Sequence, residues 1–551
     1  PKTTMSLAQQ APLPPSTKKK VHFDALVFSR YVASCWIVAH HFYGQATFEA
    51  PSAATAGVRL GHRAQSRALK VFHFGTLWTQ YFFFLSGFVL TLARFTSRDP
   101  DELKPTWRFV AERLTTTYPA YALSLVLMLF NRGDALITVQ LADWVNFGLH
   151  VTLLQAWWPQ MVCADRFYVK LDPLLVLPRA PKVRTSMIHW NTPAWFMSAL
   201  LFYWLLFKPL YRLVRRLPSR SLGLVFFACW LCSSFAFFDN TLLRGGGGIN
   251  AARDALYRYH PFAYVHVFFG GMVFARLFVE DHVSSEDAEE EDDASSLFRH
   301  QVAFLRRRFV ARGASVAYFV IFTTALTTSV EALSGSSSRK GGENALFFFW
   351  HNGGLLPLFA LLVAGLCSER DTLSHLFAHP VLVAVGSVSY AQYIIQGVVF
   401  HLVYQAYRAA FFRHSYYRQE PYGPWTFQLV LPLVLFASAF LVHHCLSVPC
   451  ASHLRKKLDD LSSSSSRSSK LGLAATNART YGTLFSSNGG APTSSSSKKT
   501  SRGSLAAQLE TAPLVSSTPP RRWHPPPPRS SSSSSSSRRD DDDPPASFTS
   551  V

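Results

Sequence analysis

Cysteine is scarce and scattered in this sequence. Seven of the 551 residues are cysteines, and their spacing gives no disulfide framework. Cys229 and Cys232 form a C-x-x-C pair inside an apolar run, but no second ligand pair accompanies them, so packing is a simpler explanation than zinc or redox chemistry. No His, Asp or Glu spacing indicates a metal site either. The sequence therefore predicts no metal and no permanently bound cofactor.

Several other signatures are missing. The formal net charge is +21, yet no nucleic-acid-binding motif accompanies it, so we predict no nucleic-acid partner. The acidic run in residues 280–297 lacks EF-hand spacing. No internal repeat is evident, which weakens the case for a transporter built from inverted repeats. Residues 1–20 show no cleavable signal pattern, so the first apolar segment is expected to remain as an anchor.

Long apolar segments are what the sequence has in abundance. The chain is 48% hydrophobic and 14% aromatic, and apolar windows of about 20 residues recur, which is typical of membrane helices. We predict an all-α integral membrane protein with about ten transmembrane helices. The expected spans are residues 24–44, 77–95, 114–130, 193–211, 222–240, 261–279, 313–333, 345–366, 381–405 and 426–447.

Basic residues predict the orientation of these helices. Three lysines at positions 18–20 place the N-terminus in the cytosol by the positive-inside rule. If residues 144–158 are interfacial or re-entrant, the arginine clusters in 212–220 and 306–308 also fall inside. Both termini are then cytosolic. The external loop 45–76 is an exception to the rule, because it carries Arg59, Arg63, Arg67 and Lys70.

Composition divides the chain into three parts. Residues 1–20 form a cytosolic segment, and residues 21–450 form the multi-pass membrane domain, with an acidic and basic cytosolic loop at 280–312. Residues 451–551 are rich in Ser, Pro and Arg and are expected to form a disordered cytosolic tail. The serine tracts favour a eukaryotic endomembrane or plasma membrane.

The first apolar segment carries an unusual set of polar side chains. Arg30 and His41 are eleven residues apart, which leaves them within about 20° on one helical face and about 16 Å apart along the axis. His40 lies about 100° from His41 around the helix. Ionisable side chains inside membrane segments are costly and commonly functional. This face therefore offers a cation toward the cytosol and a titratable base toward the outside.

The same segment, RYVASCWIVAHH, resembles the R-x10-H pattern of the acyltransferase family 3 proteins. These are integral-membrane acyltransferases that move an acyl group from a coenzyme A donor to an acceptor hydroxyl. Other stretches are similar to the family's motifs in the expected order, and together they cover residues 21–450. They are YFFFLSGFVLT (81–91), ERLTTTYPAYALSLVL (112–127), NTPAWFMSALLFYWLLFKPL (191–210), FFGGMVFARL (268–277) and VGSVSYAQYIIQGVVFHLVY (385–404).

Three positions depart from the family's pattern. Thr116 stands where a second arginine usually follows Arg113, Ala199 replaces a glutamate that often follows Trp-x-x-Ser, and Gln396 replaces a late histidine. These departures leave His41 intact. They affect the expected donor contacts and the class of acceptor.

The resemblance implies roles for particular residues. His41 is expected to be the catalytic base, because imidazole can exchange a proton near neutral pH, and Arg30 would serve the donor side or orient the catalytic helix. Acyl-CoA is the expected donor. Its binding residues would be Arg108, Arg113 and Ser86, with Ser86 and Gly87 also permitting close helix approach. Trp195, Ser198, Tyr390 and Gln392 would line the substrate cavity.

Two other functional classes remain open at this stage. A multi-pass transporter would use Arg30 and His41 to line a pathway for anionic or protonatable molecules. An inactive relative would act as a sensor or scaffold.

His351, in the stretch FFFWHNGG, faintly resembles the Trp-His of the membrane-bound O-acyltransferase superfamily. The sequence leaves open whether the acceptor is a glycan, a sterol, another lipid or a small metabolite. The acyl chain length and the oligomeric state are also open.

Overall fold

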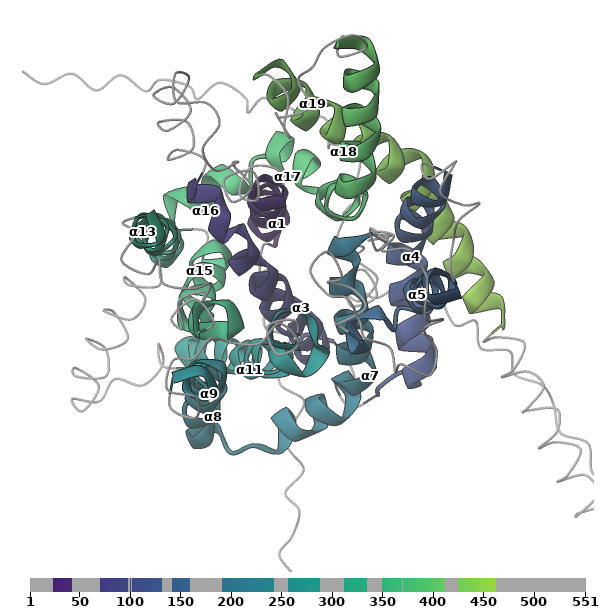
Figure 1. The fold of residues 1–551 in the computed structure, drawn as a ribbon. Coiled ribbons are helices and arrows are strands. Elements are labelled where there is room, and N and C mark those ends of the chain that lie inside the picture. The colour runs from purple at the N-terminus through teal and green to yellow at the C-terminus, as the bar shows by residue number, and fades with distance from the viewer. Residues whose placement is uncertain are drawn as a thin grey trace, which may run out of the picture. The chain divides into compact units, whose positions relative to one another are not determined.

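The computed structural model describes residues 23–41, 70–97, 100, 102–130, 141–158, 191–241, 256–287, 312–333, 349–368, 370–411 and 425–461. These residues all belong to one unit, Pro1–Val515, and their regular elements are helices (Figure 1). No strand occurs within them. The all-α prediction is therefore confirmed for the part of the chain that the structure describes.

The principal helical elements of the described residues follow one another along the chain. In order they are α1 (Asp24–Ala39), η3 (Lys70–Leu77), α3 (Trp78–Phe95), α4 (Thr106–Phe130), α5 (Leu141–Val151), η5 (Gln155–Trp157), η6 (Thr192–Ala194), α7 (Trp195–Arg216), α8 (Ser219–Cys232), α9 (Phe235–Thr241), η7 (Pro261–Tyr264), α11 (Val265–Asp287), α13 (Gly313–Leu333), η8 (Trp350–Gly354), α15 (Leu356–Cys367), α16 (Thr372–Phe377), α17 (Pro380–Gly386), α18 (Ser389–Phe411), α19 (Trp425–Leu441) and η9 (Val442–Ser447).

Fewer helices than expected have the length and composition of a membrane span. Among the described residues five qualify: Phe74–Phe95, Trp195–Arg216, Ser219–Asp239, Pro261–Glu280 and Leu429–Leu461. A sixth is counted if the bent pair Pro380–Gly386 and Ser389–Val403 forms one span. The predicted number of ten is therefore not confirmed. α1 has 16 residues and is about 24 Å long, which is shorter than a hydrocarbon core of about 30 Å.

Two predicted spans are interrupted. The span predicted at 381–405 bends by 47° between α17 and α18. The span predicted at 345–366 breaks in η8, where Gly353 has φ +116°. Glycine adopts this left-handed region at no steric cost, and a Cβ at this position would lie 2.6 Å from Ser233 Oγ. For this reason the described part of the span predicted at 345–366 consists of two helical segments, η8 and α15.

Several helix boundaries also differ from the prediction. α4 begins at Thr106, so Arg108 and Arg113 lie on its first turns rather than in a loop. α11 continues to Asp287, into the start of the predicted loop 280–312. The predicted interfacial segment 144–158 contains the end of α5, a turn at Leu153 with φ 58°, and η5.

The C-terminal boundary was placed too early. Helix continues beyond η9 through residues 448–461, here called the terminal helix. Residues 451–461 are therefore ordered helix rather than the start of a disordered tail, because the terminal helix packs its polar side chains against α4. The predictions for residues 1–20, 45–69, 288–311 and 462–551 lie outside the described residues.

The closest helix crossing joins α3 to α11. A Cβ at Gly87 would lie 2.1 Å from the Phe268 carbonyl oxygen, and a Cβ at Gly271 would lie 2.1 Å from the Phe84 carbonyl oxygen. Each glycine thus admits the backbone of the opposite helix, as small residues do at membrane helix interfaces. This confirms the close approach predicted at Gly87, while the neighbouring Ser86 is half-buried.

We expect Gly87→Ala to destabilise the protein by about 1–3 kcal/mol, because the added methyl group forces two backbones apart. The thermal midpoint of the purified protein in detergent measures the effect. Gly223→Ala in α8 is the matched control, since nothing lies within 4 Å of its Cβ position. A midpoint for Gly87→Ala equal to that of Gly223→Ala would contradict the reciprocal glycine contact.

Candidate functional site

α1 and α18 run parallel and are joined by polar contacts, two of which have the same spacing on both helices. Ser34 Oγ donates to the Ser389 carbonyl at 3.3 Å, and seven residues further along both helices His41 Nδ1 lies 2.9 Å from Gln396 Oε1. The matching spacing keeps the two helices in register over this length. Gln396 was noted in the sequence only as a departure from the family, and its pairing with His41 is a feature of the fold.

The partners of Gln396 determine which nitrogen of His41 carries hydrogen. Gln396 Nε2 donates to the Tyr393 carbonyl at 2.8 Å, so its Oε1 faces His41. An amide oxygen only accepts hydrogen bonds, which makes His41 Nδ1 the donor and leaves a lone pair on Nε2. His41 is therefore held as the Nδ1–H tautomer. The ring of His40 lies 5.5 Å from that of His41.

Arg30 lies on the same helix and is buried. Its side chain is 6% exposed, so it does not extend to solvent as a snorkelling arginine would. The Tyr81 hydroxyl lies within electrostatic range of the guanidinium and is bonded to Ser29 Oγ at 2.6 Å. Arg30 therefore faces α3, and its distance along α1 from His41 is about 16 Å.

Two of the predicted substrate residues lie on α18. The Tyr390 hydroxyl donates to the Thr117 carbonyl of α4 at 2.9 Å, and Gln392 Nε2 lies 3.3 Å from Cys35 Sγ of α1. Gln392 Oε1 is buried and has no hydrogen-bond partner among the described residues. α18 thus brings Tyr390, Gln392 and Gln396 to the space between α1 and α4.

The two predicted substrate residues on α7 have other surroundings. Trp195 packs edge-to-face on Phe83 at 5.9 Å and on Tyr259 at 5.4 Å. Ser198 Oγ accepts from the Ala156 backbone N–H at 3.4 Å, which fastens η5 to α7. No contact found among the described residues joins either side chain to His41 or Arg30.

Asn191 was missed by the sequence reasoning. It precedes η6, and its Nδ2 donates to Ser124 Oγ and to the Ile394 carbonyl, both at 2.8 Å. Asn191 therefore ties α4 to the segment of α18 that carries Gln396. Its place in the NTPAW stretch gave no signal for partners so distant in the chain.

The predicted donor residues on α4 lie near the terminal helix. Arg108 Nε bonds Glu112 at 3.2 Å, and its Nη2 bonds Asp459 at 2.7 Å. The Arg113 guanidinium lies 5.2 Å from the centroid of the Phe109 ring. Ser86, on α3, makes no hydrogen bond with the described part of the chain. Arg108 thus belongs to a charged cluster with Glu112 and Asp459, whereas Arg113 stacks on an aromatic ring and Ser86 lies on another helix.

A second group of buried polar residues surrounds the break in η8. Gln80 Nε2 donates to the carbonyls of Trp350 and His351, and Trp230 Nε1 donates to the Gly354 carbonyl at 3.0 Å. His351 Nδ1 lies 2.9 Å from the Tyr264 hydroxyl. These contacts supply hydrogen bonds that the broken helix cannot make internally, so the surroundings of His351 are those of a structural residue.

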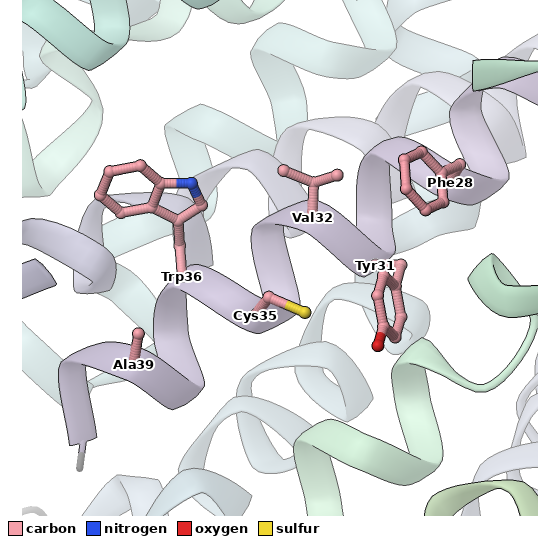
Figure 2. Close-up of a pocket in the computed structure, with 6 residues that line it drawn as sticks. All are labelled: Phe28, Tyr31, Val32, Cys35, Trp36 and Ala39. Atoms are coloured by element: carbon pink, nitrogen blue, oxygen red, sulfur yellow. The ribbon is translucent and has the colours of Figure 1, made fainter. Parts of the chain in front are cut away.

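A groove of about 310 Å³ runs along another face of α1 (Figure 2). At 100° per residue, that face is on average roughly 150–170° from Arg30 and His41. The groove therefore lies on a different face of α1 from His41, although its Cys35 also contacts Gln392 of α18. Its lining residues are Phe28, Tyr31, Val32, Cys35, Trp36 and Ala39.

Helices long and apolar enough to cross a membrane define the chain as a helical protein of membrane type. The acyltransferase family 3 model, described as an acyltransferase domain, matches residues 24–444. The chain therefore belongs to the acyltransferase family 3.

The comparison with curated proteins gives a distant relative. The acyltransferase MdmB of Streptomyces mycarofaciens is 24% identical over 217 residues, which are 39% of this chain and 44% of the relative. The match thus spans less than half of that relative's length. No solved structure matches the chain.

We expect Gln80→Leu to lower stability by about 1–3 kcal/mol, because two buried carbonyls of η8 lose their donor. The control on the same helix is Thr91→Val, which removes a buried hydroxyl that has no partner among the described residues. Thermal unfolding in detergent measures both variants. If Gln80→Leu unfolds at the same temperature as Thr91→Val, Gln80 does not hold the broken helix.

Proposed function

We propose that the protein is an integral-membrane O-acyltransferase that moves an acyl group from acyl-CoA to an acceptor hydroxyl, with His41 as the base. The observation that carries the proposal is the hydrogen bond between His41 Nδ1 and Gln396, which leaves Nε2 with its lone pair. Membership of the acyltransferase family supports the reaction class.

The reaction proceeds through a tetrahedral intermediate. His41 Nε2 removes the proton of the acceptor hydroxyl as the oxygen forms a bond to the thioester carbonyl carbon. The carbon–sulfur bond then breaks, and the departing sulfur of coenzyme A takes the proton from the imidazolium. The products are an ester and free coenzyme A, and His41 returns to its starting tautomer. Gln396 accepts from Nδ1–H throughout and stabilises the imidazolium while it exists.

The donor enters from the cytosolic side in this proposal, with both termini in the cytosol of a eukaryotic endomembrane or plasma membrane. Arg108 and Arg113 contact its phosphates, and Arg30 lies between them and His41 along the path of the donor. Tyr390 and Gln392 border the path, and the buried Gln392 Oε1 offers an acceptor to a substrate hydroxyl or amide. The acceptor substrate is a hydroxylated glycan, lipid or small molecule.

Isotope-labelled acetyl-CoA tests the reaction class. The full-length protein in lipid nanodiscs is incubated with the donor and a panel of hydroxylated glycans, sterols and small molecules, and esters are detected by mass spectrometry. We expect labelled ester and an equal amount of free coenzyme A. Uptake of substrates by proteoliposomes without any ester formation would favour a transporter instead.

We expect His41→Ala to lower kcat by about 10²–10⁴-fold, which is the usual contribution of a general base, while the protein still elutes as a folded species. His40→Gln is the control, because His40 lies on a different side of the helix and is expected to retain transfer. Normal turnover by folded His41→Ala would rule out His41 as the base.

The assigned tautomer gives a separate test. Gln396→Leu removes the acceptor of His41 Nδ1–H, so we expect kcat to fall by about tenfold or more, with a smaller change in KM. Gln396→Glu keeps an acceptor in the same place and is expected to restore most of the turnover. Equal kcat values for the Leu and Glu variants would show that Gln396 does not orient the base.

A further inference from the structure

The terminal helix, residues 448–461, packs antiparallel on the first turns of α4. Asp459 Oδ1 bonds Arg108 Nη2 at 2.7 Å, and Arg455 Nη2 donates to Thr116 Oγ1 at 2.6 Å. Asp459, the later residue of the terminal helix, thus meets Arg108, the earlier residue of α4, and Arg455 meets the later Thr116. These contacts join positions more than three hundred residues apart in the chain. A segment expected to belong to a tail is instead part of the surface that carries Arg108 and Arg113.

Positive charge exceeds negative charge at this surface. Lys104 Nζ and Arg108 Nε both bond Glu112, at 3.0 and 3.2 Å. Glu112 and Asp459 also lie within electrostatic range of Arg455. The cluster, here called the cation seat, consists of Lys104, Arg108 and Arg455 with the carboxylates of Glu112 and Asp459. These five side chains carry three positive and two negative charges, a balance that favours an anion.

The cation seat is connected to His41 through α18. Thr116, which accepts from Arg455, is followed by Thr117, whose carbonyl accepts from the Tyr390 hydroxyl. Six residues beyond Tyr390 on the same helix, Gln396 bonds His41. Six residues of helix rise by about 9 Å. Arg455 therefore lies on the Tyr390 side of His41, and the rise from Tyr390 to Gln396 is shorter than the flexible arm of coenzyme A.

We infer that Arg455 binds the phosphates of the acyl-CoA donor, and that Asp459 is the counter-ion that those phosphates displace from Arg108. This inference rests on the proposed acyltransferase function. A guanidinium has five N–H donors in a planar fork that matches phosphate oxygens, and the hydrogen bond to Thr116 directs the fork of Arg455 toward α4. The ion pair between Arg108 and Asp459 is partly exposed, so its exchange for a phosphate costs little.

Calorimetric titration with coenzyme A tests the inference without requiring turnover. The full-length protein is placed in nanodiscs of phosphatidylcholine, and pantetheine, which has no phosphates, serves as the second ligand. We expect Arg455→Gln to weaken coenzyme A binding by about tenfold, which is the loss of about 1.4 kcal/mol, and to leave pantetheine binding unchanged. The KM for acetyl-CoA is expected to rise in parallel while kcat stays within about twofold.

Matched variants separate a binding role from a structural one. Lys456→Gln removes the same charge from an exposed neighbour on the same helix and is expected to bind coenzyme A as the wild type does. Arg455→Lys keeps the charge without the fork, so its affinity should lie between those of wild type and Arg455→Gln. Asp459→Asn removes the competing carboxylate and is expected to tighten binding.

Three results would overturn the inference. The first is coenzyme A binding by folded Arg455→Gln equal to that of Lys456→Gln. The second is equal weakening of coenzyme A and pantetheine binding, which indicates a structural role for Arg455. The third is a loss that appears only in nanodiscs with phosphatidylserine, which assigns the cation seat to a lipid headgroup. Coenzyme A binding that depends on Arg455 in a protein without transfer would refute the proposed function but keep this inference.

Discussion

Polar groups that are buried among apolar helices must find partners inside the protein, and this requirement determines which helices of the chain meet. His41 and Gln396 join α1 to α18, and Asn191 joins α4 to α18. Gln80 donates to two carbonyls of η8. Each of these side chains loses its water on burial and recovers hydrogen bonds only if a particular distant element is in place. The apolar surfaces favour burial in general, whereas the polar pairs specify the register.

This constraint explains which features of the fold could be predicted from the sequence. Helices were predicted in the right parts of the chain because long apolar runs are a local signal. The break at Gly353 was not predicted, since it depends on distant side chains that complete the hydrogen bonding of the interrupted backbone. The bend before Ser389 was not predicted either, and there Gly386 lies against the backbone of α1. The helical spacing of Arg30 and His41 was likewise local. The pairing of His41 with Gln396 spans 355 positions in the chain and leaves no local signal.

The N-terminal end of α4 shows a second limit of local reasoning. Arg108 and Arg113 were recognised as cations that could meet a phosphate, but the pairing of Arg108 with Asp459 could not be predicted. Residues 451–461 follow the last apolar run and precede serine-rich sequence, so composition assigned them to the tail. Their helix is nevertheless continuous with α19 and η9, and its Arg455 and Asp459 are four residues apart and therefore lie on one face. The four-residue spacing of Arg455 and Asp459 is a local signal for a polar helical face. No local pattern indicates that this face packs on α4.

The two faces of α1 have different surroundings. One face carries Arg30 and His41 toward buried polar partners on α3 and α18, and the opposite face lines the apolar groove of Figure 2. Burying Arg30 in the bundle is expensive, because a guanidinium loses its hydration there. Packing of the apolar side of α1 must offset this desolvation cost to hold the helix in place. The rings of Phe28 and Phe377 meet edge-to-face at 5.0 Å and those of Trp36 and Phe322 at 5.9 Å. The apolar face therefore helps to keep His41 within hydrogen-bonding distance of Gln396.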